Sequence, residues 1–159
     1  MSEPRLAAPG ARYHASFLAA LREFHDEGLH TELRPDVLAD PEEFRRWTEA
    51  AETPTHREYW WVAGAHFLGR ARLNLRLTGE LPEFGGHIGY DIRPTARGRG
   101  HATALLRAVL SAARGAGIDC ALLTCAPDNH ASRRVIERNG GVFTDISSAG
   151  RLRFWCPTG

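Results

Sequence analysis

The feature that most constrains this chain is the segment Arg97-Gly98-Arg99-Gly100-His101-Ala102. It lies between a strand-like run that ends at Ile92 and a helix-like run that ends at Arg114. Two glycines in a short connection let the backbone approach a ligand without interference from side chains. The helix that follows directs its unpaired N–H groups and the positive end of its dipole at the same place. The sequence therefore predicts a site for a phosphate or pyrophosphate group.

Size and composition limit the possible classes of protein. A chain of 159 residues suits one domain, residues 1–159, with a core of its own. The net charge of +1 provides no basic field, so we expect no nucleic-acid partner. No apolar run reaches the roughly 18 residues of a membrane span, and residues 1–5 lack the apolar core of a signal peptide. We expect a cytoplasmic protein that does not contact a membrane.

Cysteine, histidine and lysine usage carries further information. Cys120, Cys125 and Cys156 are odd in number and form no C-x-x-C pair, so we expect buried, reduced thiols, with a catalytic Cys125 as the alternative. The 8 histidines show no metal-ligand spacing, and we expect no metal site. All 20 basic residues are arginine, so the protein cannot be acylated on a lysine side chain of its own.

Periodicity and turn residues predict a β-α-α-β-β-β-α-β-α-β-β order. The Asp40-Pro41-Glu42-Glu43 segment is a strong helix start. Leu73, Leu75 and Leu77 alternate with Arg72, Asn74 and Arg76, which predicts a half-buried antiparallel strand. The predicted strands are 5–8, 59–63, 67–77, 87–92, 120–125, 142–146 and 152–156. The predicted helices are 11–27, 98–114 and 129–139, together with a helix that begins at residue 41. The fold class is a mixed α/β sheet, mostly antiparallel, with one parallel, right-handed β-α-β step across the glycine segment.

Two well-known phosphate-binding motifs do not fit the glycine segment. A P-loop requires a lysine, and the chain contains none. A dinucleotide-binding loop requires a third glycine, and Thr103 stands there instead. Asp119 precedes the next strand, whereas the acidic residue of that fold follows it.

The segment resembles the GNAT (GCN5-related N-acetyltransferase) superfamily, whose [RQ]-x-x-G-x-[GA] signature is matched by Arg97, Gly100 and Ala102. Asn129-His130-Ala131-Ser132, followed by Glu137, Gly140 and Phe143, is similar to the second conserved block of the family. More narrowly, the chain resembles a bacterial group of predicted acetyltransferases of unassigned substrate. The resemblance extends from about Tyr59 to Phe143. It implies a GNAT-like sheet whose central strands, here 87–92 and 120–125, splay apart.

The resemblance implies that acetyl-CoA binds as a cosubstrate between these strands. Backbone groups of Tyr90, Asp91 and Ile92 would pair with the pantetheine arm, and a strand amide would stabilise the oxyanion. Asn129 would contact the arm from the other side, or serve as a helix N-cap, and Ser132 would add a contact. The pyrophosphate would bind the backbone of Gly98, Arg99, Gly100, His101, Ala102 and Thr103, with the side chains of Arg97 and Arg99 as further contacts.

The implied reaction is a direct attack of an amine on the acetyl thioester. His87 is the candidate base because relatives often have a Glu at this position and histidine titrates near neutrality, with Glu83 and Tyr90 as weaker candidates. The tyrosine that many relatives use as an acid corresponds here to Ile136. This departure keeps open the alternative of a non-catalytic acyl-CoA-binding or regulatory module. The acceptor is expected to be a small-molecule or peptide amine, and the protein a possible homodimer.

Overall fold

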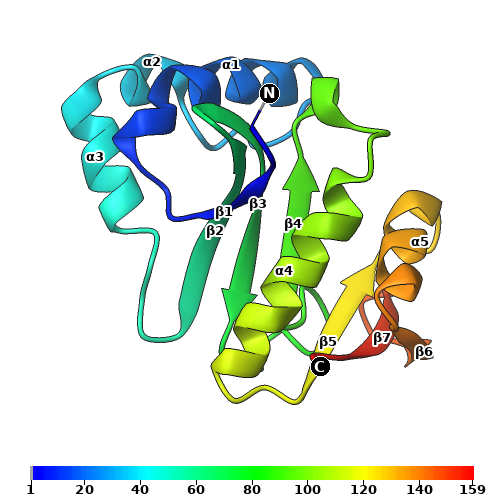
Figure 1. The fold of residues 1–159 in the computed structure, drawn as a ribbon. Helices are drawn as coiled ribbons and strands as arrows, with labels where there is room; N and C mark the ends of the chain where they lie inside the picture. Colours follow the sequence, from blue (N-terminus) through cyan, green and yellow to red (C-terminus); the bar gives the residue numbers. More distant parts are fainter. Residues whose placement is uncertain (1) are drawn as a thin grey trace.

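The computed structural model describes residues 2–159, which form seven strands, five α-helices and two 3₁₀ turns (Figure 1). The strands are β1 (Arg5–Ala7), β2 (His56–Ala63), β3 (His66–Asn74), β4 (Ile88–Ile92), β5 (Cys120–Cys125), β6 (Val142–Ile146) and β7 (Leu152–Pro157). The helices are α1 (His14–Asp26), α2 (Pro35–Leu38), α3 (Pro41–Glu49), α4 (His101–Gly115) and α5 (His130–Arg138), and the 3₁₀ turns are Ala11–Tyr13 and Pro94–Ala96.

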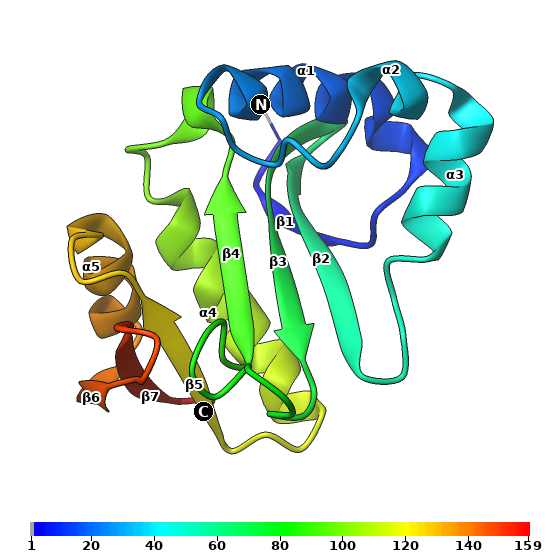
Figure 2. The same cartoon turned by 180° about the vertical axis from the view of Figure 1, so that it is seen from behind.

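The strands form two antiparallel sheets and not the single mixed sheet that the sequence predicts. The order is β1-β2-β3-β4 in one sheet and β5-β7-β6 in the other. Every strand pair within residues 2–159 is antiparallel, so the predicted parallel step from β4 to β5 does not appear as a hydrogen-bonded strand pair. The two strands belong to separate sheets, and their arrows diverge toward the arrowheads (Figures 1 and 2). Diverging strands cannot form a continuous ladder of hydrogen bonds.

Local signals account for most helix boundaries. The Asp40 carboxylate accepts a hydrogen bond from Glu42 N–H at 2.8 Å, which confirms the predicted start of α3. The predicted first helix begins later, at His14, because Ala11–Tyr13 forms a 3₁₀ turn. The short helix α2 was not predicted, since four residues give no periodic pattern.

Two apolar clusters pack against the first sheet. One cluster joins Leu105, Leu106 and Val109 of α4 to residues of the first sheet and of β5. The other lies under α1 and α3, where the Phe17 and Trp60 rings stack with centroids 4.9 Å apart. Trp60 belongs to this second cluster and its neighbour Trp61 to the first, as alternation along a strand requires.

The strand β3 departs from its predicted pattern at its end. It stops at Asn74, and the Asn74 side chain is buried, although alternation placed it on the solvent face. The Asn74 amide donates to the Gly86 carbonyl at 3.1 Å, and the Asn74 N–H donates to the His87 carbonyl at 2.7 Å. The residue is buried because it holds the end of the loop 78–86 against β3.

None of the helices in residues 2–159 has both the length and the hydropathy to cross a membrane.

Candidate active site

A cleft of about 770 Å³ lies where the end of β4, the start of α4 and the helix α5 meet. Most of the predicted cofactor-binding residues line it, although they come from three separate parts of the chain. Those residues are Tyr90, Asp91, Ile92, Arg97, Gly98, Gly100, His101, Ala102, Thr103, Asn129 and Ser132. Neither Arg99 nor His87 is among its lining residues. The sequence reasoning did not single out Glu27, Leu29, Ala96, Ala131, Arg134, Val135 and Arg138, which also line it.

The glycine segment forms an open cradle at the start of α4. Gly98 and Gly100 have φ angles of 76° and 82°, in the left-handed region that favours glycine. A Cβ atom at either position would meet nothing within 4 Å, so the space above the backbone is free. No side chain caps α4, whose first turn has N–H groups without partners inside the helix. The segment therefore provides the donors that a pyrophosphate group requires.

The Arg97 side chain fixes the position of the glycine segment through hydrogen bonds. Its guanidinium donates to the Ile92 carbonyl at 3.1 Å and to both carboxylate oxygens of Glu27 at 2.9 and 3.0 Å. These bonds connect the glycine segment to the end of β4 and to the end of α1. A contact between Arg97 and a phosphate stays a prediction, and its charge is already paired in this structure.

The helix α5 is held against β4 across the cleft. The Tyr90 hydroxyl lies 2.8 Å from Ser132 Oγ, and burial raises the pKa of Tyr90 to about 12. The Asn129 carboxamide oxygen accepts a hydrogen bond from Ser132 N–H at 3.1 Å, which confirms the helix N-cap role. The position that carries a tyrosine in many relatives, Ile136, is fully buried and packs against Gly141. Its side chain therefore belongs to the core, and it does not line the cleft.

His87 joins β4 to β5 and has no free base nitrogen. Its buried ring accepts a hydrogen bond from Leu122 N–H at Nδ1, at 2.8 Å, which places the proton of the neutral ring on Nε2. Burial lowers the pKa of His87. In this form neither nitrogen can take a proton from an amine unless the Leu122 bond breaks. The geometry therefore argues against the predicted base role and gives His87 a structural one.

The weaker candidates for a catalytic group are also engaged elsewhere. The Glu83 carboxylate accepts hydrogen bonds from Ser148 N–H and Oγ, at 2.7 and 2.8 Å, and these bonds lower the pKa of Glu83. Burial raises the pKa of Cys125, which is the opposite of an activated thiolate. Cys125 and Cys156 are buried as predicted, whereas Cys120 is exposed, contrary to the prediction. Residues 2–159 contain no group of three or more His, Cys, Asp or Glu side chains suited to a metal ion.

Sequence reasoning missed a hydrogen-bonded His–Asp pair beside the cleft. His30 Nε2 lies 2.5 Å from Asp91 Oδ2, so the loop after α1 is attached to β4. His30 has a φ of 53°, a left-handed conformation that is strained for a residue other than glycine. Asp91 Oδ1 is buried and has no hydrogen-bond partner among the described residues. The two residues are 61 positions apart, and no local motif relates them.

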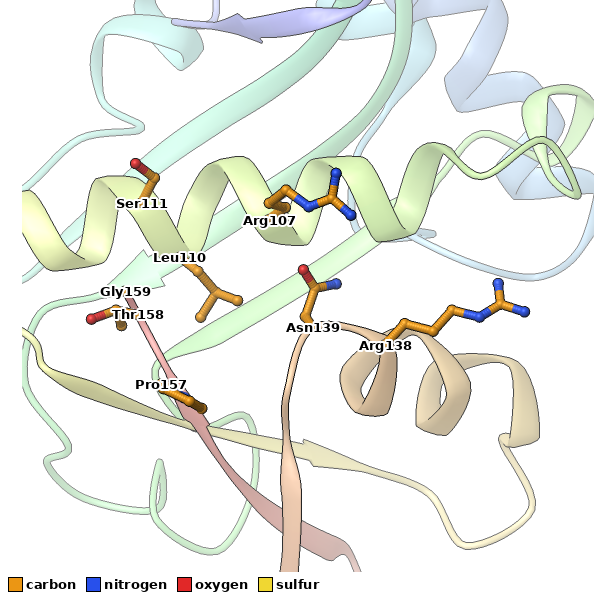
Figure 3. Close-up of a pocket in the computed structure, with 8 residues that line it drawn as sticks. All are labelled: Arg107, Leu110, Ser111, Arg138, Asn139, Pro157, Thr158 and Gly159. Carbon is orange, nitrogen blue, oxygen red and sulfur yellow. The ribbon is translucent and has the colours of Figure 1, made fainter.

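A second, smaller hollow of about 350 Å³ lies between α4, the end of α5 and the last residues of the chain (Figure 3). Arg107 of α4 and Arg138 of α5 both line it, and Arg138 also lines the cleft. Between them, the Asn139 amide donates to the Thr103 carbonyl at 3.2 Å and to the Val135 carbonyl at 3.0 Å. The end of α5 is thereby fixed to the first turn of α4.

Comparison with known proteins gives a consistent assignment. The model of the acetyltransferase (GNAT) domain matches residues 14–142. No curated protein matches the chain in sequence. Solved structures with the same fold include the microcin C7 self-immunity acetyltransferase MccE with acetyl-CoA and AMP, which is 13% identical with a TM-score of 0.69 over 99% of this chain and 93% of that one.

Two further structures have the same fold. The aminoglycoside acetyltransferase AAC(6')-Ib, in complex with coenzyme A and kanamycin, is 17% identical with a TM-score of 0.68 over 98% of this chain and 95% of that one. The ribosomal L7/L12 alpha-N-protein acetyltransferase RimL, with coenzyme A, is 17% identical with a TM-score of 0.67 over 98% of this chain and 93% of that one. At this identity the likeness establishes the fold alone.

The fold and the cleft together define an acetyltransferase-type domain, in which a glycine segment at a helix N-terminus lines a cleft with the end of β4 and with α5. Because the family model covers well over half of the sequence, the chain belongs to the GNAT acetyltransferase family.

Proposed function

We propose that this protein is an acetyl-CoA-dependent N-acetyltransferase. The observation that carries the proposal is the open cradle of Gly98 and Gly100 at the start of α4, beside the end of β4. A Cβ-free surface and a set of unpaired N–H groups suit a pyrophosphate. Acetyl-CoA supplies the activated acetyl group when it is bound.

The residues of this chain would bind and orient that cosubstrate. Backbone N–H groups from Gly98 to Thr103 hold the pyrophosphate, and backbone groups from Tyr90 to Ile92 pair with the pantetheine arm, as in strand addition. Where β4 separates from β5, a strand amide stabilises the negative charge that develops on the thioester oxygen. The Tyr90–Ser132 contact holds α5 against β4, and the neighbouring Asn129 lies on the α5 wall of the cleft.

The reaction that fits this arrangement is direct transfer to a neutral amine. A C–N bond forms at the acetyl carbon, the C–S bond breaks, and the sulfur leaves as a thiolate that takes up a proton. We assign the initial deprotonation of the ammonium group to water, because His87 Nδ1 is occupied by Leu122 N–H. No side chain is assigned as the acid, because Ile136 lies in the core. A thiolate is an adequate leaving group without one.

The acceptor is a small-molecule or peptide amine, by analogy with the aminoglycoside and ribosomal-protein acetyltransferases of the same fold. A screen that measures thiol release from acetyl-CoA tests the proposal, with kanamycin, aliphatic polyamines and peptides with free α-amines as acceptors. Release above the no-acceptor rate with at least one amine class supports it.

The alternative is a non-catalytic acyl-CoA-binding module, which the core position of Ile136 keeps open. Tight binding of acetyl-CoA without transfer to any amine of the panel would favour this alternative. The predicted homodimer is tested separately, by light scattering.

A further inference from the structure

Two arginines form a row along the cleft side of α5. Arg134 and Arg138 are four positions apart, so they lie on the same face of the helix, and both line the cleft. Both are exposed at the surface. Within residues 2–159, neither guanidinium takes part in an ion pair, whereas Arg133 on the same helix pairs with Glu137 at 3.3 Å.

The other charged groups of the cleft already have partners within the protein. Arg97 forms an ion pair with Glu27 at 2.9 Å, and Asp91 Oδ2 lies within hydrogen-bond distance of His30 Nε2, at 2.5 Å. The uncompensated formal charge of the lining is therefore positive and is concentrated on α5. A positive row at one wall of a cleft attracts an anionic group of the ligand to that wall.

The row lies next to the pyrophosphate cradle. Asn139, which directly follows Arg138, donates its amide to the Thr103 carbonyl in the first turn of α4 at 3.2 Å. Figure 3 shows Arg138 and Asn139 together at the end of α5, opposite Arg107 on α4. At the other end of α5, Ser132 contacts Tyr90 of β4. The helix thus spans the cleft from the strand that would hold the pantetheine arm to the turn that would hold the pyrophosphate.

The chemistry of the ligand determines what this row can bind. The pantetheine arm of CoA is uncharged and the pyrophosphate belongs to the glycine cradle, so one anionic group is left, the 3′-phosphate on the ribose. Guanidinium groups bind phosphate through paired, charge-assisted hydrogen bonds. We infer that Arg134 and Arg138 form the 3′-phosphate site, so that the cleft selects CoA over dephospho-CoA. This inference rests on the proposed function.

Titration calorimetry with CoA and with dephospho-CoA tests it. The wild-type protein is expected to bind CoA about tenfold more tightly than dephospho-CoA, the scale of one or two charge-assisted contacts at an exposed site. In the Arg134→Gln/Arg138→Gln double variant this ratio falls toward one through a loss of CoA affinity, while the affinity for dephospho-CoA is unchanged. Arg133→Gln removes the same charge from the same helix outside the cleft and is expected to keep the wild-type ratio.

The outcomes separate this inference from the proposed function. Equal binding of the two ligands by the wild-type protein, or an unchanged ratio in the double variant, would overturn the 3′-phosphate site and leave the pyrophosphate cradle intact. Failure of the wild-type protein to bind either ligand would overturn both. The wild-type ratio requires no variant, so the test does not depend on how well the double variant folds.

Discussion

His87 and Leu122 form two hydrogen bonds with each other, both of 2.8 Å. The His87 N–H donates to the Leu122 carbonyl, and the Leu122 N–H donates to His87 Nδ1. In a regular sheet the Leu122 N–H would donate to a backbone carbonyl of a neighbouring strand. Here His87 Nδ1 accepts that hydrogen bond instead. The start of β4 is held against the middle of β5 by this pair, and the strands belong to separate sheets. The side chain thus supports the strand arrangement beside the cleft.

Removal of the imidazole should destabilise the protein. His87→Ala leaves the Leu122 N–H without its acceptor and opens a cavity beside Trp155, so we expect a loss of about 2–3 kcal/mol in the free energy of unfolding. Urea denaturation measures it. His87→Asn keeps an acceptor oxygen near the position of Nδ1 and should lose less. A thermally stable His87→Asn variant that had lost transfer activity would instead support the base role.

Burial of His87 also makes stability depend on pH. Because burial lowers the pKa of His87 in the folded state, the unfolded chain takes up a proton first as the pH falls. The contribution is complete above the ordinary histidine value of about 6.5 and is lost progressively as the pH decreases below it. Urea midpoints at about pH 7.5 and about pH 5.5 should therefore differ more for wild type than for His87→Asn.

The comparison with His87→Asn is necessary because His56 and His101 also make the protein less stable as the pH falls. Burial lowers the pKa of both residues, so the wild-type curve contains contributions from all three. An equal pH dependence in wild type and in the His87→Asn variant would contradict the account of His87.

The Gly86 backbone packs tightly against β5. A Cβ atom there would lie 2.3 Å from the Leu122 carbonyl oxygen, and its φ is +64°. Gly79, in the same loop, has a φ of +59° and open space around a Cβ atom. Gly79→Ala should therefore lower the free energy of unfolding by about 1 kcal/mol, through the strain of the left-handed conformation alone. Gly86→Ala adds the steric clash and should lower it by at least about 3 kcal/mol. Equal urea midpoints for the two variants would show that the end of the loop at Gly86 does not approach β5 this closely.

The His30–Asp91 pair should control the loop that follows α1. Asp91→Asn removes the charge from a partly buried hydrogen bond, so we expect a loss of about 1–2 kcal/mol and faster amide exchange around residues 27–33. Asp36→Asn is the matched control, because Asp36 and its partner Arg34 are both exposed and such a surface pair should contribute little to stability. Unchanged exchange in the loop of the Asp91→Asn variant would refute the anchoring role.

Features with a local signal could be predicted from the sequence. The Asp40 cap, the apolar β5 strand and the glycine segment before α4 each depend on neighbouring residues, and the structure has all three. The residues assigned to the cleft from family resemblance also lie together, apart from Arg99 and His87. Their roles in binding stay predictions.

Features that depend on distant residues could not be predicted. Alternation placed Asn74 in solvent because nothing near it indicates the Gly86 carbonyl that its amide contacts. Periodicity identified β4 and β5 but contains no information on whether two strands pair or diverge, so their divergence was expected from the family resemblance alone. Likewise, the family resemblance and the titration range of histidine suggested that His87 is a base, and only the position of Leu122 shows that His87 Nδ1 is occupied.

Acetyl-CoA binding by two matched glutamate variants tests the central claim most directly. Gly100 and Gly150 have φ angles of +82° and +77°, and both have open space around a Cβ atom, so the substitutions carry the same conformational cost and the same charge. Gly100→Glu places a carboxylate in the proposed pyrophosphate cradle, whereas Gly150→Glu lies in the β6–β7 turn. We predict by calorimetry that Gly150→Glu binds acetyl-CoA like wild type and that Gly100→Glu binds at least about a hundredfold more weakly. Equal affinity of the two variants, or no binding by the wild-type protein, would contradict the account.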